Sequence, residues 1–69
     1  MSDSVYRVTE VIGVSPDGWE AAARNAVETA AKTVRDLRIA EATRFDVTIN
    51  DGKVEHYRVR LDISFKYEG

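Results

Sequence analysis

The sequence predicts an α+β fold in the order β-α-β-β, with a three-stranded antiparallel sheet packed against one helix. Three observations predict it. Residues 54–67 alternate between polar and apolar side chains, as a strand with one buried face does. Residues 16–37 carry apolar side chains at three- and four-residue steps, the spacing of a helix with one buried face. Between two alternating stretches, "NDGK" contains Asp-Gly, a strong signal for a tight hairpin turn.

The composition limits the class of protein. The chain of 69 residues predicts one domain, 1–69, and so short a chain buries only about 60% of its extended surface. It has no cysteine for disulfides or thiolate metal sites, so oligomerisation is the favoured source of extra stability, ahead of a metal with oxygen ligands. The net charge of −2 does not favour a nucleic-acid partner. No apolar stretch approaches the roughly 20 residues of a membrane span, and the N-terminus lacks a signal-peptide pattern, so we expect a cytoplasmic protein without a membrane partner.

The first strand is expected over residues 5–12 and the helix over residues 16–37. Ser15, Pro16 and Asp17 form a strong helix start. They offer a hydroxyl cap, a proline at the first helical position and an acid near the positive end of the helix dipole. The apolar stripe of the helix consists of Trp19, Ala23, Ala26, Val27, Ala30, Val34 and Leu37.

The second strand is expected over residues 39–49 and the third over residues 54–67. The third strand would be roughly 48 Å long, whereas a helix over residues 16–37 would measure roughly 33 Å. One helix cannot cover a sheet of that length. The part of the third strand that the helix does not reach, above all Phe65 and Tyr67, therefore needs a neighbouring molecule to cover its apolar side chains. The geometry thus predicts self-assembly.

The strings "VYRVTEVIGVSPDGWEAAARNAV" and "YRVRLDISFKYEG", together with the size and the element order, resemble the dodecin family over essentially the whole chain. The resemblance implies a sheet wrapped partly around a single helix and twelve copies assembled into a hollow homododecamer. It also implies storage or quenching of flavins, bound in pairs at subunit interfaces, rather than an enzymatic reaction.

Two positions carry the flavin site of the family, and this sequence departs from the pattern at both. Ile39, in "LRIAEA", stands where the family has a tryptophan that sandwiches the flavin ring. Arg58, in "YRV", stands where the family has a glutamine that hydrogen-bonds the ring edge. Isoleucine has no π-face, and arginine supplies donors only. We therefore do not expect ordinary binding of riboflavin or FMN, although residual binding through Arg58 remains an alternative.

The stretches "SPDGWEAAA" and "DISFKYE" look closest to a subgroup of the family that lacks the flavin tryptophan and is described as calcium-binding. Calcium is therefore a candidate ligand, but no set of metal ligands matches residue by residue. The densest group of side-chain oxygens is Asp46, Asn50 and Asp51 around the hairpin, which a solvated turn explains better. A single acid could also meet its own copies on a threefold axis.

His56, Trp19 and Glu10 are further candidates, and Arg58 has more than one interpretation. His56 is the only histidine and is expected to be a surface residue, and Trp19 is expected to pack in the core. Glu10 interrupts the apolar side of the first strand, so we expect it to pair with Arg58 or Arg60, either in the sheet or across an interface. For Arg58 we weigh a solvent-facing or lumen-facing surface with cross-strand ion pairs against binding of an anion or a partner's carboxylate.

The sequence therefore predicts a dodecin-like shell that binds or stores a small ligand and is not an enzyme. The ligand pocket would be at the family's flavin positions, Ile39 and Arg58. Two alternatives remain open: a small enzyme at a subunit interface around His56 and Arg58, and a purely structural assembly.

Overall fold

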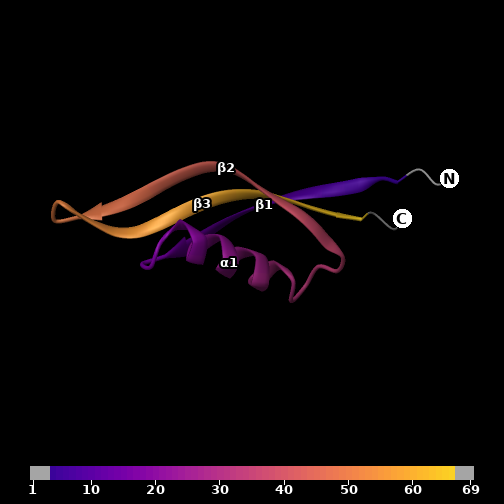
Figure 1. Cartoon of the computed structure of the whole chain (residues 1–69), viewed down its shortest axis with the longest axis horizontal. Coiled ribbons are helices and arrows are strands. Elements are labelled where there is room, and N and C mark those ends of the chain that lie inside the picture. Colours follow the sequence, from indigo (N-terminus) through magenta and orange to yellow (C-terminus); the bar gives the residue numbers. More distant parts are fainter. Residues whose placement is uncertain (1–3, 67–69) are drawn as a thin grey trace.

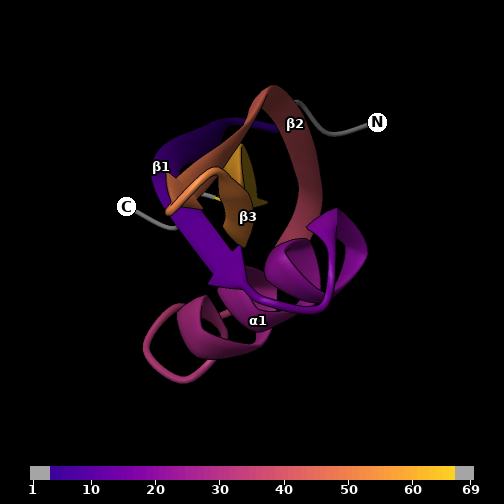
Figure 2. The same cartoon turned by 90° about the vertical axis from the view of Figure 1, so that its left-hand side faces the viewer.

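The computed structural model describes residues 4–66, which form the predicted order of elements. Strand β1 spans Tyr6–Ser15, helix α1 spans Trp19–Ala30, strand β2 spans Leu37–Asn50 and strand β3 spans Lys53–Lys66. The sheet is antiparallel in the order β1-β3-β2, so β3 lies in the middle. Figures 1 and 2 show the long, twisted sheet with α1 on one side only. The predicted fold class and hairpin are confirmed.

The core lies between β3 and α1. The apolar side of the alternating stretch 54–67 is buried against Ala22 and Ala26 of the helix. Its buried residues are Val59, Leu61 and Ile63. These small helical side chains allow α1 to approach the sheet closely. We call the side of the sheet that faces α1 the inner face and the opposite side the outer face.

The helix is shorter than predicted at its C-terminal end. It ends at Ala30 rather than at Leu37, which is the first residue of β2 and pairs with Phe65. The β-branched Thr33 and Val34 are weaker helix formers. Asp36 then adopts a left-handed backbone conformation with φ of 60°, which breaks the helical path and leads the chain into the sheet.

The start of the helix also differs from the prediction. Ser15 is the last residue of β1 and is buried, and its Oγ accepts a hydrogen bond of 3.0 Å from the backbone N–H of Asp17. The N-cap is Gly18, which has no side-chain cap, so Pro16 is not the first helical residue. The hydroxyl of Ser15 therefore stabilises the turn before the helix.

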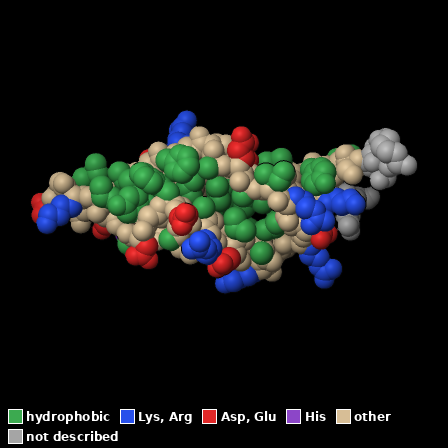
Figure 3. Space-filling view, in the orientation of Figure 1, with side chains coloured by type: hydrophobic (Ala, Val, Ile, Leu, Met, Phe, Trp, Pro, Cys, Tyr) green, Lys and Arg blue, Asp and Glu red, His purple; other side chains and the backbone are tan. Residues whose placement is uncertain are grey.

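The strands extend beyond their predicted bounds and leave much of the sheet without cover. Strand β1 continues from residue 12 to Ser15, and β2 begins at Leu37 rather than at residue 39. Tyr67 of the predicted overhang lies outside the described residues, and Phe65 is half-buried. The principal-axis extents of 55 × 21 × 16 Å describe an elongated molecule, and apolar side chains run along the face shown in Figure 3. The exposed large apolar side chains are Val5, Tyr6, Val8, Ile12, Val14, Trp19, Ile39, Phe45, Ile49 and Val54.

This exposed apolar surface supports the prediction of self-assembly, because an isolated small domain rarely leaves so many large side chains in water. Within residues 4–66, no helix is long and apolar enough to cross a membrane.

Candidate functional site

Arg58 lies on the outer face of β3 and forms a hydrogen-bonded ion pair with Asp46 of β2, which lies directly opposite in the sheet. Its Nε donates to Oδ1 of Asp46 at 2.7 Å, and its Nη2 donates to Oδ2 at 2.9 Å. The planar guanidinium thus engages both oxygens of one carboxylate, the strong bidentate arrangement. This contact is the cross-strand ion pair expected if Arg58 lies on a solvated face of β3.

The charges around this pair keep it ionised. The hydrogen bond from Arg58 lowers the pKa of Asp46 below its ordinary value, and the positive charges of Arg58, Arg60 and Arg44 lower it further. The same bond raises the pKa of Arg58. Both groups therefore carry charge at neutral pH, and Arg58 has a carboxylate partner in its own chain.

Ile39 lies on the same outer face but far from Arg58. It pairs with Ser64 and is 66% exposed. Ser64 and Arg58 are six positions apart on β3, which corresponds to about 20 Å. One chain therefore does not bring Ile39 and Arg58 together, and a pocket that contains both requires a second copy.

Trp19 is not part of the buried core, contrary to the prediction. It is 42% exposed and meets the rings of Phe45 and Tyr57 edge-on, with centroid separations of 5.9 and 5.0 Å. Its indole N–H donates to the backbone carbonyl of Asp46 at 3.2 Å. The reason is that α1 begins at Trp19, beside the part of the hairpin that runs past the end of the helix. Among residues 4–66, no segment covers the exposed side of the ring.

The oxygen groups around the hairpin do not form a cation site. Both carboxylate oxygens of Asp46 accept bonds from Arg58. Asp51 and Gly52 form the tight turn, with φ of 55° and 73°. Across the described range, 4–66, no three His, Asp or Glu side chains lie close enough together to hold a metal ion. The interpretation of this segment as a turn is supported.

Glu10 does not meet an arginine in the chain. Its register partner is Asp62, which also faces Glu41 on the other side, so three acids lie in one row across the sheet. No ion pair joins Glu10 to Arg58 or Arg60 within residues 4–66. The pairing expected in the sheet is therefore wrong, and pairing across an interface stays a prediction. The register places Ile12, rather than Glu10, beside Arg60.

His56 remains close to the surface, as expected. Its Nδ1 lies 3.9 Å from the carboxylate of Glu55, and both side chains are well exposed. Its backbone N–H donates to Oγ1 of Thr48 at 3.0 Å. Neither contact assembles an acid–base pair with Arg58.

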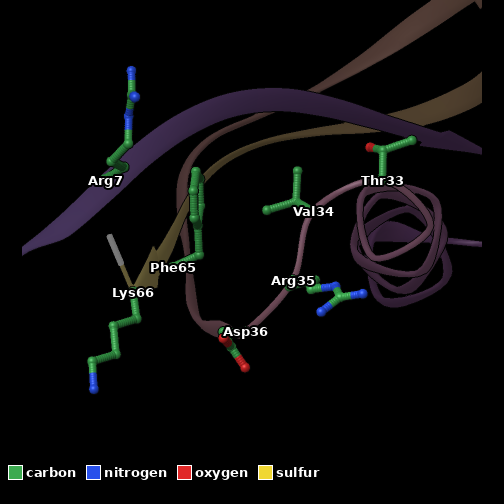
Figure 4. A pocket seen from close by; sticks show the side chains of 7 residues that line it. All are labelled: Arg7, Thr33, Val34, Arg35, Asp36, Phe65 and Lys66. Carbon is green, nitrogen blue, oxygen red and sulfur yellow. The ribbon is translucent and has the colours of Figure 1, made fainter. Parts of the chain in front are cut away.

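A groove of about 510 Å³ lies at the end of the sheet near both termini, and sequence reasoning did not find it. Phe65 and Val34 form its apolar part, and Figure 4 shows the charged side chains around it pointing in different directions. These are Arg7, Arg35, Asp36 and Lys66. Because the residues come from three separated segments, no single stretch of sequence signals the groove. The charges do not converge on one point, so the groove does not present an evident anion site.

Comparison with known proteins decides the family. A sequence model of the dodecin family, described as Dodecin, matches residues 5–68. The chain belongs to the dodecin family. Its relatives include the calcium dodecin of Mycobacterium tuberculosis, 41% identical over 91% of this chain and 89% of the relative. The dodecin of Thermus thermophilus is 38% identical over 93% of both chains.

Solved dodecin structures have the same fold. The dodecin of Streptomyces coelicolor superposes with a TM-score of 0.94 at 48% identity and covers 100% of this chain and 99% of its own. The M. tuberculosis calcium dodecin, whose structure is described as having a novel calcium-binding site, superposes with a TM-score of 0.83 at 42% identity, covering 94% of this chain and 93% of its own. The predicted family is confirmed, and dodecameric assembly is consistent with it.

Proposed function

We propose that this member of the dodecin family forms a homododecameric shell that binds or stores a small ligand, without catalysis, and that its flavin pocket is altered. The observation that carries the proposal is the bidentate pair between Arg58 and Asp46. Arg58, the residue at the family's glutamine position, already donates two hydrogen bonds to Asp46 of its own chain.

The chemistry of both positions supports this proposal. Ile39 offers apolar surface but no π-face to stack on a flavin ring. Arg58 has only donors, so it cannot accept a hydrogen bond from the ring edge as a glutamine amide does. Two of its N–H groups are also directed at Asp46. These residues do not fit the ordinary flavin clamp.

The test is a titration of riboflavin and FMN with the purified assembly, followed by quenching of flavin fluorescence. We expect no quenching by the natural chain at micromolar protein. We expect quenching by the variant Ile39→Trp/Arg58→Gln, with the two single variants as matched controls. Quenching by the natural chain would contradict the proposal and favour residual flavin binding. If the double variant also fails to quench while its mass remains that of the assembly, these positions do not form the pocket.

Calcium is a second candidate ligand because a relative 41% identical to this chain is named a calcium dodecin. The described residues of one copy hold no ready cluster of acids, so a calcium site would have to combine side chains from several copies. Isothermal titration with calcium, compared between the assembled protein and a dissociated variant, tests this. Heat of binding that appears only in the assembled protein would support a shared site, and its absence from both would exclude calcium.

An enzyme centred on His56 and Arg58 has less support. Arg58 is bonded to Asp46, and the nearest acid to the His56 ring is the well-exposed Glu55. We therefore favour a binding shell over a catalyst.

A further inference from the structure

A short part of β2, residues 44–48, is out of step with the strand on either side of it, and we call it the shifted segment. The pairing with β3 has an irregularity at each end of this segment, between Ala42 and Arg44 and between Thr48 and Ile49. The two irregularities cancel, so the parts of β2 next to the segment follow one common register, and the segment departs from it by one residue. A shift by one residue turns every side chain of a strand to the opposite face.

The shift decides which side chain stands beside Arg58. In the observed register Asp46 lies opposite Arg58 on the outer face. Phe45, next to Asp46 in the chain, lies opposite Val59 on the inner face. If the common register continued through the segment, Phe45 would lie opposite Arg58 on the outer face. Asp46 would then lie opposite Tyr57 on the inner face. The ion pair of Arg58 therefore exists only because the segment is shifted.

Trp19 joins the helix to the shifted segment from the inner face. Its indole N–H donates to the backbone carbonyl of Asp46 at 3.2 Å, and its ring meets that of Phe45 edge-on. The same indole meets the ring of Tyr57, the neighbour of Arg58 on β3. One side chain thus contacts both strands next to the ion pair, from the opposite side of the sheet.

The position of Trp19 suits it to this role. Among residues 4–66, the helix packs chiefly on β1 and β3, and a groove of about 430 Å³ lies between α1 and the side chains of Ala40 and Ala42 on β2. Gly18, just before Trp19, has φ of 137°, a backbone conformation that glycine adopts readily. This glycine sets the direction in which α1 begins, and so directs the indole at the shifted segment.

The ion pair alone gives the shifted register little support. The side chains of Arg58 and Asp46 are 40% and 42% exposed, and ion pairs in such contact with water contribute little to stability. Trp19, in contrast, meets Phe45 only while that ring lies on the inner face. Continuation of the common register would turn the ring away and remove the edge-to-face contact. Trp19 therefore favours one register over the other.

We propose that Trp19 is a positioning residue that holds residues 44–48 in the shifted register and thereby keeps Asp46 on Arg58. Trp19 then decides the charge at the family's ligand position. With Asp46 in place the pair is neutral overall, whereas without it Arg58 presents an unbalanced cation that favours anionic ligands. This consequence for ligand choice rests on the proposed function, which places Arg58 in the pocket. The effect of Trp19 on the register does not depend on it.

The test traps each register with a disulfide, since the natural chain has no cysteine that could compete. Thr48 lies opposite His56 in the shifted register, whereas Val47 would lie opposite His56 in the common one. A disulfide needs Cβ atoms about 3.5–4.5 Å apart, which excludes side chains on opposite faces. The variants Thr48→Cys/His56→Cys and Val47→Cys/His56→Cys therefore report the two registers, and both leave Trp19 and the ion pair unchanged. Equilibration in a glutathione buffer and intact mass after denaturation give the closure constant of each disulfide within one chain.

The ratio of the two closure constants, shifted over common, is the quantity of interest. Trp19→Ala should lower it at least about fivefold, because a hydrogen bond and an aromatic contact that favour the shifted register are lost. Trp19→Phe retains a ring and loses the donor, so the fall should be smaller, about threefold. Val27→Ala is the matched control on the same helix, because Val27 packs against the core, and it should leave the ratio unchanged.

Each outcome decides the proposal. An unchanged ratio in Trp19→Ala would overturn it, and so would an equal fall in Val27→Ala, because the effect would then be a general loosening of the helix. If circular dichroism shows that Trp19→Ala does not fold, Trp19→Phe decides, and a ratio equal to that of the natural Trp19 background would overturn the proposal. No ligand enters this experiment, so a failure of the flavin pocket and a failure of the register assignment remain distinguishable.

Discussion

Replacement of Gly13 by alanine tests how closely the helix rests on the sheet. Gly13 is buried on β1 beneath α1. A Cβ at this position would overlap the backbone carbonyl oxygen of Ala22 and would lie 2.8 Å from its carbonyl carbon and 2.9 Å from Cβ of Ala26. Carbon atoms in contact normally stand about 3.5–4.0 Å apart, so the helix would have to move away by about 1 Å.

This displacement should be costly because the obstacle is helix backbone, which cannot rotate aside. Overpacking of a core typically costs about 1–3 kcal/mol, and we expect Gly13→Ala near the upper end, about 3 kcal/mol. That corresponds to a loss of about a hundredfold in the folded-to-unfolded ratio. Urea denaturation followed by far-UV circular dichroism measures it, at one fixed protomer concentration because association adds to stability.

Gly52→Ala is the matched control. Gly52 has open space around it but a φ of 73°, so its penalty arises from the left-handed backbone alone, about 1–2 kcal/mol. The reasoning would be refuted if Gly13→Ala lost no more stability than Gly52→Ala, because the helix would then not be seated on Gly13.

Three further predictions concern the core, the ion pair and the exposed tryptophan. Ile63→Ala removes a fully buried side chain and should cost about 2–5 kcal/mol in urea, and a cost below 1 kcal/mol would mean that the core is elsewhere. The folded-state pKa of Asp46 lies below its ordinary value of 3.8, so the ion pair stabilises the fold fully above that value and is lost as pH falls through the lowered pKa. Acid titration by circular dichroism should therefore show a loss of stability below pH 3.8 that Asp46→Asn lacks, and identical acid profiles would contradict the pair. Trp19→Phe removes the donor to the carbonyl of Asp46 and should cost about 0.5–1.5 kcal/mol in thermal unfolding, whereas no change would show that this bond adds nothing.

The ion pair of Asp46 and Arg58 shows where prediction from the sequence stopped. Counting back from the Asp51–Gly52 turn without interruption places Asp46 opposite Tyr57. A bulge between Thr48 and Ile49 shifts the register by one residue and places Asp46 opposite Arg58 instead. The alternation of side chains was readable from the sequence, but the position of a bulge depends on packing of the whole sheet.

The row of three acids across the sheet has the same origin. Glu10 comes from β1, Asp62 from β3 and Glu41 from β2, and only the register of three strands places them in line. Taken singly in the sequence, each is an ordinary surface acid. Pairing of Glu10 with an arginine in the sheet, one of the two predicted alternatives, failed for this reason.

The sequence by itself determined the element order, the hairpin turn and the buried side of β3, because periodicity and turn chemistry are local properties of the chain. It also determined what stands at the two family positions, Ile39 and Arg58. Tertiary structure decided that the helix ends at Ala30 and that Ser15 closes a turn. It also decided that Trp19 stays half-exposed, that Arg58 bonds Asp46 and that Ile39 lies about 20 Å from Arg58. The physical reason is that each of these depends on which strand pairs with which and in what register, and that choice is settled only when the sheet and the helix pack together.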